Sequence, residues 1–137
     1  MHTVRVIGHR PDFRVFIDLV YGHGRNVDTD GDSFPVHSRE WTELYVKDRE
    51  SDDPSFEICA DDSDLGTFVV TSDAGAIEEL VALYLFDYCG ATITRERALI
   101  DQEGLEALRL KYSVQLKRAG QSPWHRSSDP QPYPTVA

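Results

Sequence analysis

The segment 74–88 is the clearest helix in the sequence, and the rest of the chain has to be arranged around it. Its apolar side chains recur three or four residues apart, which is the spacing of a helix that buries one stripe. These residues are Ile77, Leu80, Val81, Tyr84, Leu85 and Tyr88. Ser72 or Asp73 can accept hydrogen bonds from the first free backbone N–H groups. Gly90 is expected to end the helix in a left-handed conformation.

Two further apolar residues of this helix, Leu83 and Phe86, lie off the main stripe. The helix therefore has more apolar surface than one face of a sheet needs as cover. We expect a second helix or the C-terminal tail to cover Leu83 and Phe86. If neither does, these two residues form an oligomer interface with another chain.

Most of the chain before this helix has the pattern of β-strands. Residues 13–21 alternate with a period of two, which predicts a strand that pairs with 3–8 in a hairpin. Segments 41–47, 56–60 and 67–71 are separated by short polar loops, and this arrangement predicts an antiparallel meander. The side chains on the inward face of the meander are apolar: Leu44, Val46, Phe56, Ile58, Phe68 and Val70.

A second helical region is expected after Thr92. Thr94 is predicted to cap a first turn, and Asp101 to cap a segment that ends near Ala119 with Gly120 as its stop. The last residues, 121–137, contain four prolines and have the composition of a polyproline-like tail. We expect Trp124 or Tyr133 to dock this tail on the rest of the molecule.

These patterns predict one α+β domain over residues 1–120 with a docked Pro-rich tail over 121–137. The expected sheet is mainly antiparallel and has about five strands, arranged as a hairpin plus a meander. Two C-terminal helices are expected to cover one of its faces. At 137 residues the chain is long enough to bury a core without disulfides.

Charge is unevenly distributed along the chain. The formal net charge is −10, and residues 28–87 alone contain 17 acidic and three basic side chains. An acidic surface repels nucleic acid and anionic membranes, so neither is predicted as a partner; a basic protein is. Two cysteines, no secretory signal and no long apolar run predict a cytoplasmic protein.

The segment that most resembles a known metal motif is 26–32. Its residues Asn26, Asp28, Asp30 and Asp32, with Gly31 at the sixth position, match the first half of a calcium-binding EF-hand loop. The second half does not match, because His37 occupies the position of the closing glutamate. A hydrophilic turn explains the same residues, so no metal or cofactor is predicted, and a calcium module or small enzyme using the loop 22–37 stays an alternative.

The acidic meander is the stronger candidate for function. Trp41, Glu43, Tyr45 and Glu57 are expected to project from the face opposite the core. Acidic side chains in the two flanking loops add to the charge: Asp52, Asp53, Asp61, Asp62 and Asp64. Aromatic anchors among carboxylates suit a protein interface that attracts a basic partner. The same acidic neighbours are expected to raise the pKa of the Cys59 thiol, which argues against a nucleophilic role.

The resulting prediction is a non-catalytic binding protein that neutralises or masks a basic protein. In size, acidity and expected fold the chain resembles small bacterial immunity proteins. That resemblance implies inhibition of a toxin, possibly a nuclease whose substrate charge the acids would mimic. The alternative is a homodimeric acidic adaptor or secretion chaperone that associates through Leu83 and Phe86 or through the second helix.

Overall fold

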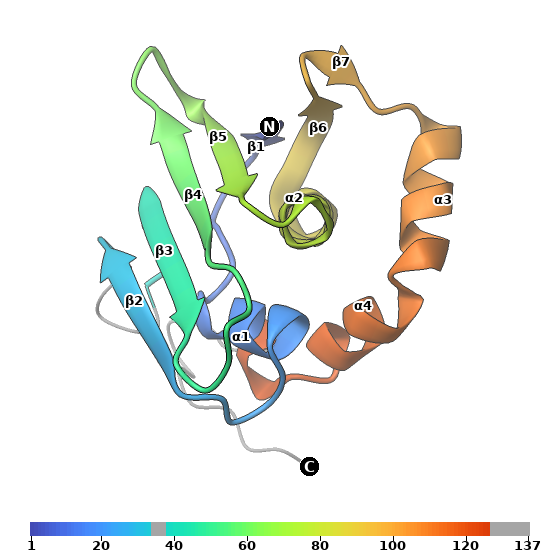
Figure 1. The fold of residues 1–137 in the computed structure, drawn as a ribbon. Helices are drawn as coiled ribbons and strands as arrows, with labels where there is room; N and C mark the ends of the chain where they lie inside the picture. Colours follow the sequence, from blue (N-terminus) through green and yellow to red (C-terminus); the bar gives the residue numbers. More distant parts are fainter. Residues whose placement is uncertain (34–37, 127–137) are drawn as a thin grey trace.

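A computed structural model describes residues 1–33 and 38–126, which contain seven strands in one open antiparallel sheet (Figure 1). The order of strands across the sheet is β2-β3-β4-β5-β1-β6-β7. The strands are β1 (His2–Val6), β2 (Val27–Gly31), β3 (Glu43–Asp48), β4 (Phe56–Asp61), β5 (Asp64–Ser72), β6 (Gly90–Arg95) and β7 (Ala98–Leu99). The helices are α1 (Arg14–Val20), α2 (Gly75–Cys89), α3 (Gln102–Lys111), α4 (Ser113–Gly120) and the 3₁₀ helix η1 (Pro123–Arg126).

Helix α2 confirms the strongest expectation from the sequence and lies at the centre of the molecule. Figure 1 shows it end-on, with the sheet on one side and the other helices around the rest of its circumference. It packs against β1, β5 and β6 and against α1 and α3. Its residues from Leu80 to Leu85 are all buried. Leu83 is fully buried within this one chain, so its expected role in an oligomer interface is wrong.

The meander is also confirmed, and its register explains the core. Leu44 of β3 is opposite Ile58 of β4, which is in turn opposite Val70 of β5. All three are fully buried on the face that the helices cover. The alternation of side chains along each strand therefore places every second residue on the opposite, outer face. The α+β class is as expected, with seven strands in place of about five.

The predicted strand at 13–21 is wrong, because these residues form helix α1. Phe13, Phe16 and Leu19 are spaced by three and are all buried, so the apolar pattern suits a helix as well as a strand. The Asp12 carboxylate accepts a hydrogen bond from the Arg14 N–H at 3.0 Å just before the helix. The expected hairpin partner, β1, pairs instead with β5 and β6.

The helical turn expected after Thr92 is also wrong, because β6 and β7 form a hairpin there. Gly90 is extended with φ −94° and is not left-handed. A side chain at Gly90 would place its Cβ 2.7 Å from the Cα of Phe86, so close packing explains this glycine. Asp101 does cap the next helix by accepting from the Gly104 N–H at 2.8 Å. The expected helix to Ala119 is interrupted at Tyr112 and forms α3 and α4.

The last described residues return to the helical layer. The guanidinium of Arg14 lies 3.9 Å from the ring centre of Trp124, and the Tyr84 hydroxyl is 2.6 Å from Nδ1 of His125. Tyr133, the other expected docking residue, lies outside the described residues. None of the helices in the described parts of the chain combines the length and the apolar run that crossing a bilayer requires.

Candidate functional site

Acidic side chains gather on the uncovered face of the sheet, across β2, β3 and β4. Tyr45 of β3 is opposite Asp30 of β2 on one side and Glu57 of β4 on the other. Asp28 and Glu43 lie two residues away along their strands, and period two places them on the same face. We call Asp28, Asp30, Glu43, Tyr45 and Glu57 the acidic outer face. Its four carboxylate residues are exposed, and the tyrosine is half-buried.

Shallow depressions lie on both sides of Tyr45 on this face. One is lined by Asp30, Glu43, Tyr45 and Glu57, and the other by Tyr45, Glu57 and Thr71 among others. Both depressions are open and polar, so a small apolar ligand would find little surface to bury there. They suit the side chains of a larger partner that lies across the strands.

The pKa of the Cys59 thiol is raised by its burial and by acidic residues of the outer face. Burial and the Glu57 carboxylate, which accepts from Sγ at 3.0 Å, raise the pKa of Cys59 to about 12. Glu43, which is opposite Cys59 across the β3–β4 pair, and Asp62 raise this pKa further. The expected rise in the Cys59 pKa is therefore confirmed, and the thiol stays protonated at neutral pH.

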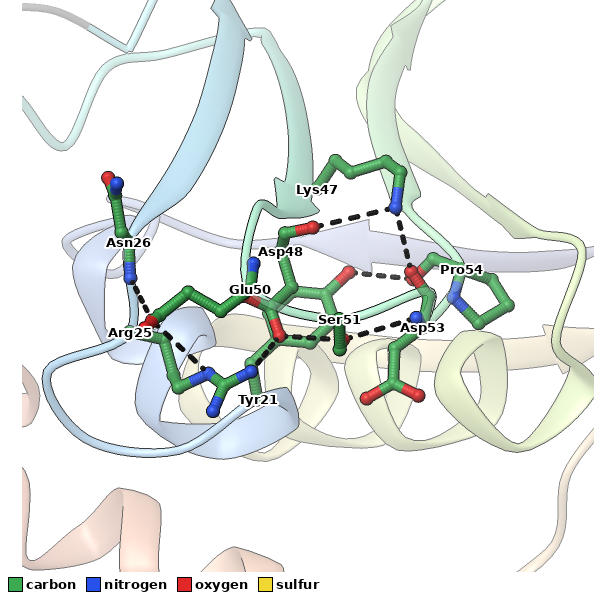
Figure 2. A network of polar contacts seen from close by, with 9 residues as sticks. All are labelled: Tyr21, Arg25, Asn26, Lys47, Asp48, Glu50, Ser51, Asp53 and Pro54. Atoms are coloured by element: carbon green, nitrogen blue, oxygen red, sulfur yellow. Dashed lines mark hydrogen bonds and ion pairs between the residues drawn. The ribbon is translucent and has the colours of Figure 1, made fainter.

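Two basic residues near this face, Lys47 and Arg49, offset part of its negative charge. Lys47 turns its ammonium group to the backbone, where it donates to the carbonyls of Asp53 at 3.1 Å and Asp48 at 3.5 Å (Figure 2). Arg49 pairs with Asp28 at 3.4 Å, and both of these side chains are exposed. Such exposed pairs are weak. The four carboxylates still outnumber Lys47 and Arg49, so the face stays net negative.

Trp41 does not belong to this face, which corrects the expectation for it. Only 1% of its surface is exposed, and its ring packs edge-on against Phe16 and Phe68. Its Nε1–H donates to the Pro11 carbonyl at 2.9 Å. The strand begins only at Glu43, so the alternation that points Glu43 and Tyr45 outward does not extend back to Trp41.

The loop that contains Asp52 and Asp53 is held in place by the buried carboxylate of Asp48 (Figure 2). This carboxylate accepts from Arg25 at 2.7 Å, from Ser51 Oγ at 2.8 Å and from the Glu50 N–H at 3.0 Å. The hydrogen bond from Arg25 is the largest cause that lowers the Asp48 pKa, to about 2.

Two further hydrogen bonds hold the far side of the same loop. The Tyr21 hydroxyl donates to the Pro54 carbonyl at 2.7 Å, and Asp53 N–H donates to Ser51 Oγ at 3.2 Å. Asp52 and Asp53 stay exposed on this fixed loop, at the end of β4 that begins with Phe56. The loop therefore presents its acids in a set position.

Asp61, Asp62 and Asp64 lie at the other end of β4: Asp61 ends β4, Asp62 is in the turn, and Asp64 begins β5. Asp61 accepts from the N–H and the hydroxyl of Ser63, which lower its pKa. Asp64 accepts from Thr67 at 2.9 Å and pairs with Arg5. Apart from the buried Trp41, the expected partner-binding residues thus fall into three groups, which are the acidic outer face and one loop at each end of β4.

The weak calcium candidates do not converge on one point. Asp28 and Asp30 lie in strand β2, where the sequence analysis expected a loop. The Asp32 carboxylate accepts from the hydroxyl and N–H of Thr42 and from the Glu43 N–H, and although burial opposes the shift, these hydrogen bonds lower its pKa. Within residues 1–33 and 38–126, no three His, Cys, Asp or Glu side chains are placed to hold a metal ion.

Sequence reasoning missed that Asp28 and Asp30 belong to the same surface as Glu43 and Glu57. The signal was the alternation in Val27–Gly31, hidden by a composition that is poor in strand-forming residues.

Phe86, the remaining interface candidate, is half-buried and lines a groove between β6, β7 and α3.

Comparison of the chain with protein-family models, curated proteins and solved structures finds no match.

Proposed function

We propose that this protein is a non-catalytic binding protein that masks a basic protein partner through the acidic outer face. The observation that supports this most directly is the placement of four exposed carboxylates around Tyr45 on three adjacent strands. Strand pairing fixes the backbone that carries these groups before the partner arrives, so little backbone ordering opposes association. Tyr45 supplies ring surface at the centre of the charged groups.

The two loops at the ends of β4 extend the negative charge beyond the face. Asp52 and Asp53 at one end and Asp61 and Asp62 at the other would accelerate the encounter with a basic surface, because long-range attraction acts before contact. Once bound, the partner's own functional surface would be covered. A toxin that binds nucleic acid has a basic surface of this kind, so an immunity-type inhibitor is the form of the function that we favour.

The test compares charge reversal on the acidic outer face with an equal reversal elsewhere. Partners are first recovered from the native host at low ionic strength and identified, and their affinity is then measured by calorimetry. We expect the double variant Glu43→Lys/Glu57→Lys to weaken binding by about a hundredfold or more, given that each close charge pair is worth about 1.5 kcal/mol or more.

The matched control is Glu103→Lys/Glu106→Lys, which makes the same change in net charge on exposed positions of α3. Its affinity should stay close to that of the unmodified protein. Equal losses in the two variants would mean that net charge alone matters. Binding that is unaffected by both variants and by added salt would refute the proposal.

A further inference from the structure

The outermost strand of the acidic region, β2, has an unpaired edge among the described residues. It is the first strand in the sheet order and is the outermost strand beside β3 in Figure 1. The backbone of Arg49 donates to the Asn26 carbonyl at 2.9 Å, and that of Asp32 donates to the Glu43 carbonyl at 3.1 Å. In an antiparallel ladder the bonded residues alternate, so the even-numbered residues of this segment bond to β3.

The odd-numbered residues of β2 consequently direct their backbone groups away from the sheet. Among the described residues, the N–H groups of Val27 and Thr29 lie outside the β2–β3 ladder, and no strand pairs with the other side of β2. Gly31 differs, because its N–H donates to the Asp30 carboxylate at 2.8 Å. Val27 and Thr29 thus leave two donors and two acceptors at the spacing that an added strand requires.

The side chains of Asp28 and Asp30 decide which strand can be added. Both lie on the acidic outer face, beside the position that an eighth strand would occupy. A second copy of β2 in antiparallel alignment would place aspartates opposite aspartates, and like charges in cross-strand pairs are unfavourable. A segment with lysine or arginine at alternate positions would instead form opposite-charge pairs.

We propose that a cationic extended segment of the partner adds to β2 as an eighth, antiparallel strand. This inference rests on the proposed function and specifies how the partner is recognised. The partner's basic residues lie opposite Asp28 and Asp30, in pairs without mutual backbone hydrogen bonds. Its intervening residues exchange backbone hydrogen bonds with Val27 and Thr29.

The first experiment uses a capped peptide of about eight residues in which lysine and threonine alternate. Binding is followed by amide NMR at low ionic strength, with a glutamate–threonine peptide as the control. We expect the lysine peptide to shift the amides of Val27 and Thr29 and to slow their hydrogen exchange. The variant Asp28→Asn/Asp30→Asn should weaken binding by about 2- to 30-fold, the range for two cross-strand charge pairs.

Methylated peptides test the backbone contacts without altering the protein. Methylation of the backbone nitrogens of the peptide's threonines removes the donors that would face Val27 and Thr29 of the protein. We expect this to weaken binding by at least about tenfold. Methylation of the lysine backbone nitrogens places the methyl groups on the far edge of the added strand and should have little effect. Equal binding of the two methylated peptides would overturn the inference.

The full partner is tested with Thr29→Pro, which removes an edge-facing N–H that is not used in the β2–β3 ladder. Binding that survives Thr29→Pro but is lost with Glu43→Lys/Glu57→Lys would refute strand addition and leave the proposed function standing. Insensitivity to both changes would refute both. A dimer in light scattering that Thr29→Pro dissociates would show that a second copy occupies the edge, and it would also overturn the inference.

Discussion

Truncation of Trp41 distinguishes a core residue from a partner anchor, and the structure predicts a large loss of stability. Core substitutions of tryptophan by alanine cost about 3–5 kcal/mol. The Pro11 carbonyl would also lose its donor, which adds about 1 kcal/mol or more. We therefore expect Trp41→Ala to lower the free energy of unfolding by about 4–6 kcal/mol, a large part of the total for a domain of this size.

Trp41→Phe separates the two contributions. It keeps a ring against Phe16 and Phe68 and removes the hydrogen bond to Pro11. The expected cost is about 1–3 kcal/mol. In urea, with a denaturant dependence of about 2 kcal/mol/M, the unfolding midpoint should fall by about 0.5–1.5 M for phenylalanine and about 2–3 M for alanine.

Far-UV circular dichroism follows unfolding in all variants, and fluorescence of Trp124 provides a second probe. Tyr45→Ala is the matched control, since it truncates an aromatic residue on the outer face and should cost roughly 1 kcal/mol or less. A Trp41→Ala protein whose stability lies within about 0.5 kcal/mol of the unmodified chain would refute the core assignment. If Trp41→Ala left stability unaltered and abolished partner binding, Trp41 would be assigned to the partner interface.

Three further predictions concern other parts of the molecule. The Asp48 pKa is lowered from 3.8 to about 2, so its contribution to stability is complete above the ordinary pKa and is lost as pH falls toward 2; urea unfolding at several pH values should show the advantage over Asp48→Asn shrinking across that range. Glu57→Gln should lower the Cys59 pKa and speed its reaction with a disulfide reagent at pH 8 by about tenfold, and an unchanged rate would contradict the pairing. Leu83→Ala should cost about 2–5 kcal/mol and leave the oligomeric state in light scattering unaltered, whereas dissociation of an oligomer would contradict its burial within one chain.

The meander and the central helix could be predicted because each has one dominant period and a buried side. A slip of one residue in β4 would move Phe56 and Ile58 to the outer face and expose both. The pairing of Leu44, Ile58 and Val70 is thus determined by the chain's own pattern. The same parity correctly places Glu43, Tyr45 and Glu57 outside.

The errors occurred where local pattern permits two answers. In residues 13–21 the spacing of the apolar side chains fits both a strand and a helix. The segment forms a helix because β1, its expected partner strand, pairs with β5 and β6. That pairing is between distant segments and leaves no trace in the local sequence. For β6, the β-branched run Thr92, Ile93 and Thr94 was a usable signal for a strand. For Trp41, period two was extended past the residue where the strand begins.

Part of the candidate surface was invisible for a different reason. Strand β2 has few residues with strand propensity, and its pairing with β3 depends on contacts such as the Asp32 carboxylate with Thr42. Gly31 adds a second requirement, because a Cβ there would lie 2.2 Å from the Glu43 carbonyl oxygen. The sequence therefore shows that Asp28 and Asp30 are polar. Only the assembled sheet shows that they share a face with Tyr45 and Glu57.

The asymmetry of charge favours binding over solubility as the reason for the acids. A charge distribution that served solubility alone would mix both signs over the whole surface. Here acids outnumber bases on the sheet face and its two loops, whereas the helical layer mixes both signs. Helix α3 carries Glu103, Glu106, Arg109 and Lys111, and α4 carries Lys117 and Arg118. Under the proposed function, the resulting field would orient an approaching basic protein toward the acidic outer face. Like charge on β2 disfavours pairing of this edge with a second copy, so the residues proposed to attract a basic strand would also protect the edge from self-association.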